Sequence, residues 1–119
     1  DNNFWLTVPP LISPDDIDYP ISGYCTSRSC PAEITREWLN KHRFPAADLI
    51  SIPFGESKVT VLNGKCDVFI DDSIKNFIEL QSNGILCYLK TRPHNVKFDV
   101  GHFRVNDAKQ FLDKVRGLN

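Results

Sequence analysis

The sequence has no methionine, no long apolar run and almost no net charge, and each absence narrows the possible classes of protein. No stretch approaches the ~20 consecutive apolar residues that a membrane-spanning helix needs. A formal net charge of -1 provides no overall field to attract a nucleic-acid polymer or an anionic membrane, so we expect neither as a partner. Because the 119 residues include no methionine, we expect the native product to have an upstream segment.

The cysteines do not have the spacing of a structural zinc site. Four residues separate Cys25 from Cys30, whereas Cys66 and Cys87 each stand alone. Cys25 and Cys87 lie inside apolar, strand-like runs, where a free thiol behaves as a small buried hydrophobe. This pattern favours a reducing, cytoplasmic protein. A disulfide framework is the less favoured alternative.

Apolar runs and helical periodicities alternate along the chain after an irregular segment at residues 1–18. They predict strands at 21–25, 49–52, 67–71 and 85–89, a short edge strand at 102–105, and helices at 31–43, 56–62, 73–82 and, capped by Asn106, at 107–115. Alternating strands and helices are typical of a parallel sheet with helices on both faces. We therefore predict a single α/β domain, with its core at 19–119.

Two adjacent carboxylates, Asp71 and Asp72, end the apolar run Val68–Ile70. In open α/β sheets, ligands bind at the carboxyl ends of the strands, and neighbouring carboxylates are natural ligands for Mg²⁺. The pair is therefore a candidate magnesium site. In the alternative interpretation, Asp72 or Ser73 only caps the following helix, and Asp71 is a solvated loop acid.

Two further polar groups occupy comparable positions. Thr26 and Ser27 end the strand at 21–25, where a hydroxyl before a helix can hydrogen-bond a phosphoryl oxygen. Lys58 lies in the predicted helix at 56–62, where an ammonium group can neutralise a phosphate. In the alternative, Thr26 is a cap and Lys58 is solvated. Together these residues predict a site for a phosphorylated small molecule.

This ordered set resembles the haloacid dehalogenase-like (HAD) superfamily of phosphohydrolases from about Tyr19 to the C-terminus. By that resemblance, Thr26 matches the phosphoryl-binding second motif, Lys58 the third-motif lysine that stabilises nucleophile and phosphoryl group, and Asp71–Asp72 the Mg²⁺-binding fourth motif. The segments 38–45 and 92–95 are similar to the 5′-nucleotidase-like branch. The resemblance implies a Rossmann-like, three-layer α/β fold and Mg²⁺-dependent hydrolysis of phosphate esters.

The superfamily's first motif, an Asp-x-Asp that ends the central strand and supplies the nucleophile, has no counterpart here. Asp16-x-Asp18 does not replace it, because prolines interrupt the preceding residues and no buried strand leads into it. Without that central strand, the sheet has a gap or the strands on either side of it pair directly. Residues 3–8, an upstream segment or a strand of a second chain, as in a homodimer, would fill such a gap.

Three functional hypotheses follow. The first is a phosphatase- or nucleotidase-like hydrolase that is inactive as given and needs its nucleophile from an upstream segment or a partner. The second is a non-catalytic protein of the same fold that binds a phosphorylated ligand or forms a dimer. The third gives Thr26, Lys58 and Asp72 structural roles only.

Overall fold

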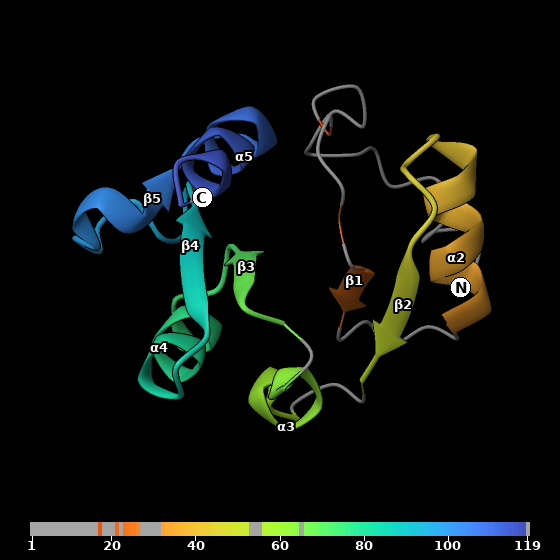
Figure 1. Cartoon of the computed structure of the whole chain (residues 1–119), viewed down its shortest axis with the longest axis horizontal. Helices are drawn as coiled ribbons and strands as arrows, with labels where there is room; N and C mark the ends of the chain where they lie inside the picture. The colour runs from red at the N-terminus through yellow and green to blue at the C-terminus, as the bar shows by residue number, and fades with distance from the viewer. Residues whose placement is uncertain are drawn as a thin grey trace. The chain divides into compact units, whose positions relative to one another are not determined.

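The computed structural model describes residues 17, 21, 23–26, 32–52, 56–64 and 66–118. The chain divides into two compact units, Asp1–Glu56 and Ser57–Asn119, which we call the N-terminal and C-terminal units (Figure 1). Each unit is described by itself. In the described ranges, no helix has the length and apolar character that crossing a membrane requires.

The N-terminal unit contains a strand, a helix and a second strand parallel to the first. These are β1 (Gly23–Thr26), α2 (Ala32–Lys41) and β2 (Asp48–Ser51). Helix α2 packs on β2 through a buried face that includes Trp38 and Leu39. The Trp38 ring stacks on Phe44 at 5.4 Å between centroids, which places this tryptophan in the core of the unit.

Glycine is required at the start of β1. A Cβ atom on Gly23 would lie 2.6 Å from the backbone oxygen of Asp48, its partner in the parallel pair. Any side chain at this position would therefore push β1 and β2 apart. The sequence predicted a strand here but not this close approach.

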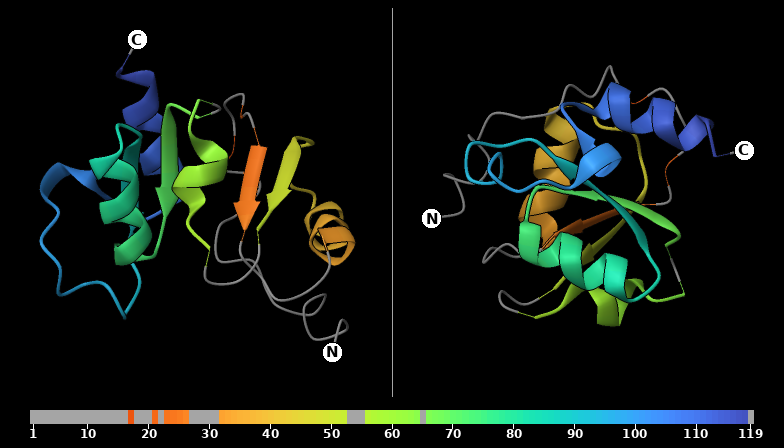
Figure 2. Two further views of the ribbon diagram at one scale, coloured as in Figure 1. Left: turned by 90° about the horizontal axis from the view of Figure 1, so that it is seen from below. Right: turned by 90° about the vertical axis from the view of Figure 1, so that its left-hand side faces the viewer.

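The C-terminal unit contains a parallel sheet of three strands in the order β3-β4-β5 (Figure 1), and Figure 2 shows the same unit from two further sides. Its elements are α3 (Lys58–Leu62), β3 (Val68–Asp71), α4 (Ile74–Ser82), β4 (Leu86–Lys90), the 3-10 helix η2 (Gly101–Phe103), β5 (Arg104–Val105) and α5 (Ala108–Arg116). Helix α4 packs on β3 and β4, whereas α5 packs on β5. The fold thus places the carboxyl ends of β3 and β4 side by side.

Strand β4 is the centre of this unit. Cys87, Tyr88 and Leu89 are all buried, so both faces of the strand are covered. Tyr88 contacts Phe111 of α5 at 5.7 Å and Phe103 at 5.9 Å between ring centroids. These contacts tie the last helix to the middle of the sheet.

The predicted α/β class with parallel strands is confirmed. The five strands of the described ranges form two sheets, β1-β2 and β3-β4-β5, whereas the sequence predicted one. Strand β1 pairs with β2 in the N-terminal unit, and β3 pairs with β4 in the C-terminal unit. The irregular segment 1–18 lies outside the described residues except for residue 17.

Several element boundaries differ from prediction for local physical reasons. The helix expected to begin at Glu56 begins at Lys58, because Ser57 is its N-cap and accepts from the Val59 amide. The residues of the apolar run Val68–Ile70 are only half-buried, since β3 is the edge of its sheet. The strand expected at 102–105 is preceded by η2 and keeps only Arg104 and Val105.

The cap of the last helix was predicted wrongly by one residue. The Asp107 side chain accepts a hydrogen bond from the Gln110 amide at 2.8 Å, whereas the Asn106 side chain bonds the Thr91 hydroxyl. An aspartate at this position satisfies one free amide of the first turn and complements the positive end of the helix dipole. Asp107 therefore fixes the start of α5.

We expect Asp107→Ala to lower the free energy of unfolding of the C-terminal unit by about 1 kcal/mol. Urea titration followed by the NMR signals of β4 amides measures this loss. Asp113→Ala is the matched control, because it removes the same group from an exposed ion pair with Arg116 on the same helix. That control should cost less than about 0.5 kcal/mol, and equal losses in the two variants would contradict the capping role.

Candidate functional site

A buried ion pair joins α3 to the end of β3. Lys58 Nζ lies 2.9 Å from Asp71 Oδ2, and the two side chains are only 11% and 6% exposed. Lys58 is the first residue of α3 and Asp71 the last of β3, so two element boundaries set the geometry. The ammonium group also lies 5.3 Å from the centroid of the Phe69 ring. The structure thus brings together two residues that the sequence had selected for one site.

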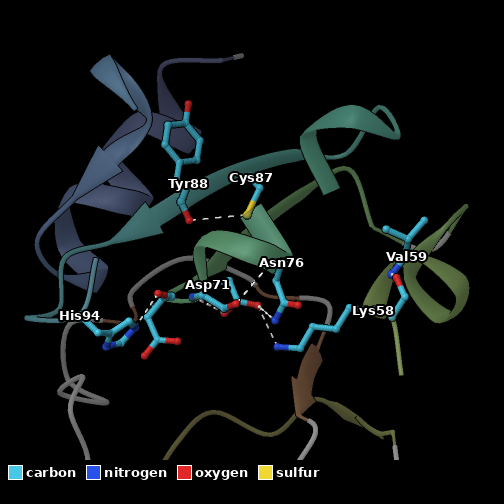
Figure 3. A network of polar contacts seen from close by, with 10 residues as sticks. Lys58, Val59, Asp71, Asn76, Cys87, Tyr88 and His94 are labelled. Atoms are coloured by element: carbon cyan, nitrogen blue, oxygen red, sulfur yellow. Dashed lines mark hydrogen bonds and ion pairs between the residues drawn. The ribbon is translucent and has the colours of Figure 1, made fainter. Parts of the chain in front are cut away.

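Helix α4 supplies two more hydrogen-bond donors to the same carboxylate. The Ser73 amide donates to Asp71 Oδ1 at 3.0 Å, and Asn76 Nδ2 donates to Asp71 Oδ2 at 3.1 Å. Figure 3 shows Lys58 and Asn76 both directed at Asp71. With three donors around it, Asp71 is a buried and oriented carboxylate. The interpretation of Asp71 as a solvated loop acid is therefore wrong.

The cap of α4 is Ser73, as one of the alternatives required. Its hydroxyl accepts from the Asn76 amide at 3.2 Å, so Asp72 is not needed for capping. Asp72 is half-buried, and its carboxylate accepts no hydrogen bond from the residues that the structure describes. Asp72 is consequently the more open of the two acidic groups.

These carboxylates fit a Mg²⁺ ion only as a minimal site. Mg²⁺ is held in many proteins by one or two carboxylates together with waters and substrate phosphate oxygens, and Asp71 and Asp72 can supply that number. Asp71 already pairs with Lys58, which competes with a cation for its oxygens, so Asp72 is the stronger ligand. Across residues 17–118 as described, no group of three or more histidine, cysteine or acidic residues has metal-binding geometry.

The charges of the pair extend their influence into the core beneath the strand ends. The pKa of Cys87 is raised to about 12, mainly by burial and in smaller part by the Asp71 carboxylate, whereas the Lys58 ammonium acts to lower it. Cys87 lies on β4 opposite Phe69 of β3. Its thiol is free, as is that of Cys66. A protonated, fully buried Cys87 is a poor nucleophile and has no direct chemical role in the site.

The phosphate-binding residues predicted on β1 are not placed beside Lys58 by the structure. Thr26 ends β1 in the N-terminal unit, and only its backbone is described, whereas Ser27 lies outside the described residues. Strand ends in two separately described units do not define one site. The joint action of Thr26, Ser27 and Lys58 therefore stays a prediction.

Sequence patterns missed three residues that support this site. Asn76 lies in the first turn of α4, and its side chain donates to Asp71. The sequence indicates this contact only by a polar residue five positions after the acid. Asn95 is fully buried in the loop after β4, and its amide bonds the backbone of Asp72. Arg104 of β5 bonds Asn95 in turn. No local pattern connects these last two with Asp72.

The fold and the site together define a class: an α/β protein with a buried lysine–aspartate pair at the carboxyl end of a parallel strand. Searches with protein-family models, among curated proteins and among solved structures found no match to this chain. The function is therefore argued from the geometry and from the resemblance of the motifs.

Proposed function

We propose that this chain carries the phosphate- and cation-binding part of a phosphohydrolase similar to the HAD superfamily, in its nucleotidase-like branch. The observation that carries the proposal is the contact between Lys58 and Asp71 at the carboxyl end of β3. The motif resemblance implies that this lysine and this acidic pair act at one site, and their contact supports that proposal. The substrate class is a phosphorylated small molecule, in the reducing cytoplasmic setting that the cysteines favour.

Lys58 is suited to bind a phosphoryl group. Its ammonium carries three donors, of which one contacts Asp71, so the others remain for anionic oxygens. Asp71 holds the long side chain in one direction, which reduces the entropy lost when a ligand binds. In the proposal, Lys58 stabilises the phosphoryl oxygens.

Asp71 and Asp72 would hold Mg²⁺ in this proposal, with Asp72 as the principal ligand. A bound Mg²⁺ supplies charge neutralisation at the phosphoryl oxygens. The described strands do not end in Asp-x-Asp, so the aspartate nucleophile of the superfamily has to come from outside the described residues or from a partner chain. The finer fold assignment, a Rossmann-like α/β fold of the HAD type, belongs to the same proposal.

The test is binding of inorganic phosphate, in the presence of Mg²⁺, to the 119-residue chain, measured by calorimetry. We expect Lys58→Met to weaken phosphate binding at least tenfold, because it removes the only charged donor that Asp71 orients. Lys109→Met is the matched control, since Lys109 is an exposed lysine of α5 and its loss changes the net charge equally. Its affinity should stay within about twofold of the wild type.

Two results would contradict the proposal. The first is wild-type protein that binds no phosphate at millimolar concentration with Mg²⁺ present, and the second is equal affinity in Lys58→Met and Lys109→Met. The chain by itself is expected to show no appreciable hydrolysis of a chromogenic phosphate ester. Robust hydrolysis that disappears in Asp71→Asn would show that the chain contains its own nucleophile.

A further inference from the structure

Asn95 is a fully buried polar residue in the loop between β4 and η2. Its Nδ2 donates to the backbone oxygens of Asp72 and Lys90, each at 2.8 Å. Its Oδ1 accepts from the Arg92 amide at 3.0 Å and from Arg104 at 3.1 Å. Every hydrogen-bonding position of the side chain is used, which removes the cost of burying an amide.

Arg104 fixes which way the Asn95 amide faces. Its guanidinium has donors only, so the oxygen of Asn95 must face it and the nitrogen must face the two strand ends. The same guanidinium also donates to the backbone oxygens of Asn95 and Phe98. The 92–98 loop is thus closed on itself around Arg104, and the Asn95 side chain has a single orientation.

The two oxygens that Asn95 binds lie just beyond the hydrogen-bonded ladder of the sheet. The last ladder pair of β3 and β4 is Asp71 and Leu89, so Asp72 and Lys90 are the next residues along each strand. At this point the Asn95 amide connects strands β3 and β4 in place of a ladder hydrogen bond. His94 adds a contact from its Nε2 to the same oxygen of Asp72, at 3.0 Å (Figure 3).

We propose that Asn95 is a positioning residue for the acidic turn Asp71–Asp72, acting through the backbone oxygen of Asp72. This inference rests on the proposed function, because the turn matters as the cation-binding end of the site. Without the amide bridge, the end of β3 loses its attachment to β4 beyond Asp71. The Asp72 carboxylate then samples more directions, and the site binds a cation less tightly.

The test measures the affinity of Mg²⁺ alone for the 119-residue chain by calorimetry, together with the amide NMR signals of Ser73 and Asn76. We expect Asn95→Ala to weaken Mg²⁺ binding at least tenfold and to shift both amide signals. Leu112→Ala is the matched control, since it destabilises the same unit from the buried face of α5 without touching the strand ends. It should leave the affinity and the two signals unchanged.

Equal Mg²⁺ affinity in Asn95→Ala and the wild type, or an equal loss in Leu112→Ala, would overturn the positioning role. If the wild type binds no Mg²⁺, the cation part of the proposed function fails, and the amide signals alone test whether Asn95 positions the turn. Unchanged Ser73 and Asn76 signals in Asn95→Ala would then refute this positioning role, and shifted signals would support it. If Asn95→Ala does not fold, Arg104→Lys is measured in the same way, because lysine cannot hold the amide as a planar fork does.

Discussion

Replacing Asp71 with alanine is expected to lower the free energy of unfolding of the C-terminal unit by about 3–5 kcal/mol, which is the usual cost of leaving one member of a buried ion pair without its partner. Lys58 is 11% exposed and would lose the counter-charge that it contacts. The variant also frees the Ser73 amide and the Asn76 side chain. Both tryptophans precede residue 57, so the loss has to be followed by the NMR signals of β4 amides in urea.

A variant without either charge separates the contribution of the ion pair from that of its surroundings. Lys58→Met combined with Asp71→Leu removes both charges, and we expect it to recover much of the stability lost in Asp71→Ala. Asp67→Ala is the control for the loss of an acid, because Asp67 precedes the same strand and is exposed. It should cost less than about 0.5 kcal/mol. A similar cost for Asp67→Ala and Asp71→Ala would refute the ion pair as a stabilising contact.

The sequence predicted the order of helices and strands because each element carries its own local signal. The apolar run of β4 and the helical spacing of Phe111, Leu112 and Val115 are independent of the rest of the fold. The number of sheets has no such signal. Apolar periodicity shows that a strand exists but does not name its partner, so a single sheet was predicted where the described strands form two.

The same distinction explains which parts of the site were predicted. Asp71 was selected because it ends a strand, and Lys58 because it lies in the predicted helix just before that strand. Elements that follow one another in parallel α/β folds bring such groups to one edge of a sheet. Their contact at 2.9 Å agrees with that expectation. Asn95 and Arg104 could not be selected in this way. Their function depends on a loop folding back onto Asp72, which lies 23 residues before Asn95.

Two sets of hydrogen bonds, one around the Asp71 side chain and one around the Asp72 backbone, hold the acidic turn by different atoms. The side chain of Asp71 is held by α3 and α4, whereas the backbone of Asp72 is held by the loop after β4. Of the two carboxylates in this turn, that of Asp72 accepts no hydrogen bond from the described residues. A ligand therefore meets a pre-oriented turn with one open acid, which lowers the ordering cost of binding.

The stability of the C-terminal unit is expected to fall steeply above pH 9 because of Cys87. In the unfolded chain this thiol ionises near its ordinary pKa of 9.0, whereas in the folded protein burial, reinforced by Asp71, raises the pKa to about 12. Between these values the unfolded state binds fewer protons than the folded state. The free energy of unfolding therefore decreases as pH rises, by about 1.4 kcal/mol per pH unit between the two pKa values. Below pH 9 the thiol is protonated in both states, and this effect is absent.

Urea titrations of the wild type and of Cys87→Ala between pH 8 and pH 11, followed by β4 amide signals or by hydrogen exchange, isolate this contribution. At pH 8 the alanine variant should have the lower free energy of unfolding, because it leaves a small void at a fully buried position. It should, however, lose less stability as pH rises. The other ionisable groups are present in both proteins, so most of their contribution is common to the two stability curves. The two stability curves should therefore converge with increasing pH, and parallel curves would show that the Cys87 thiol is not held protonated by the fold.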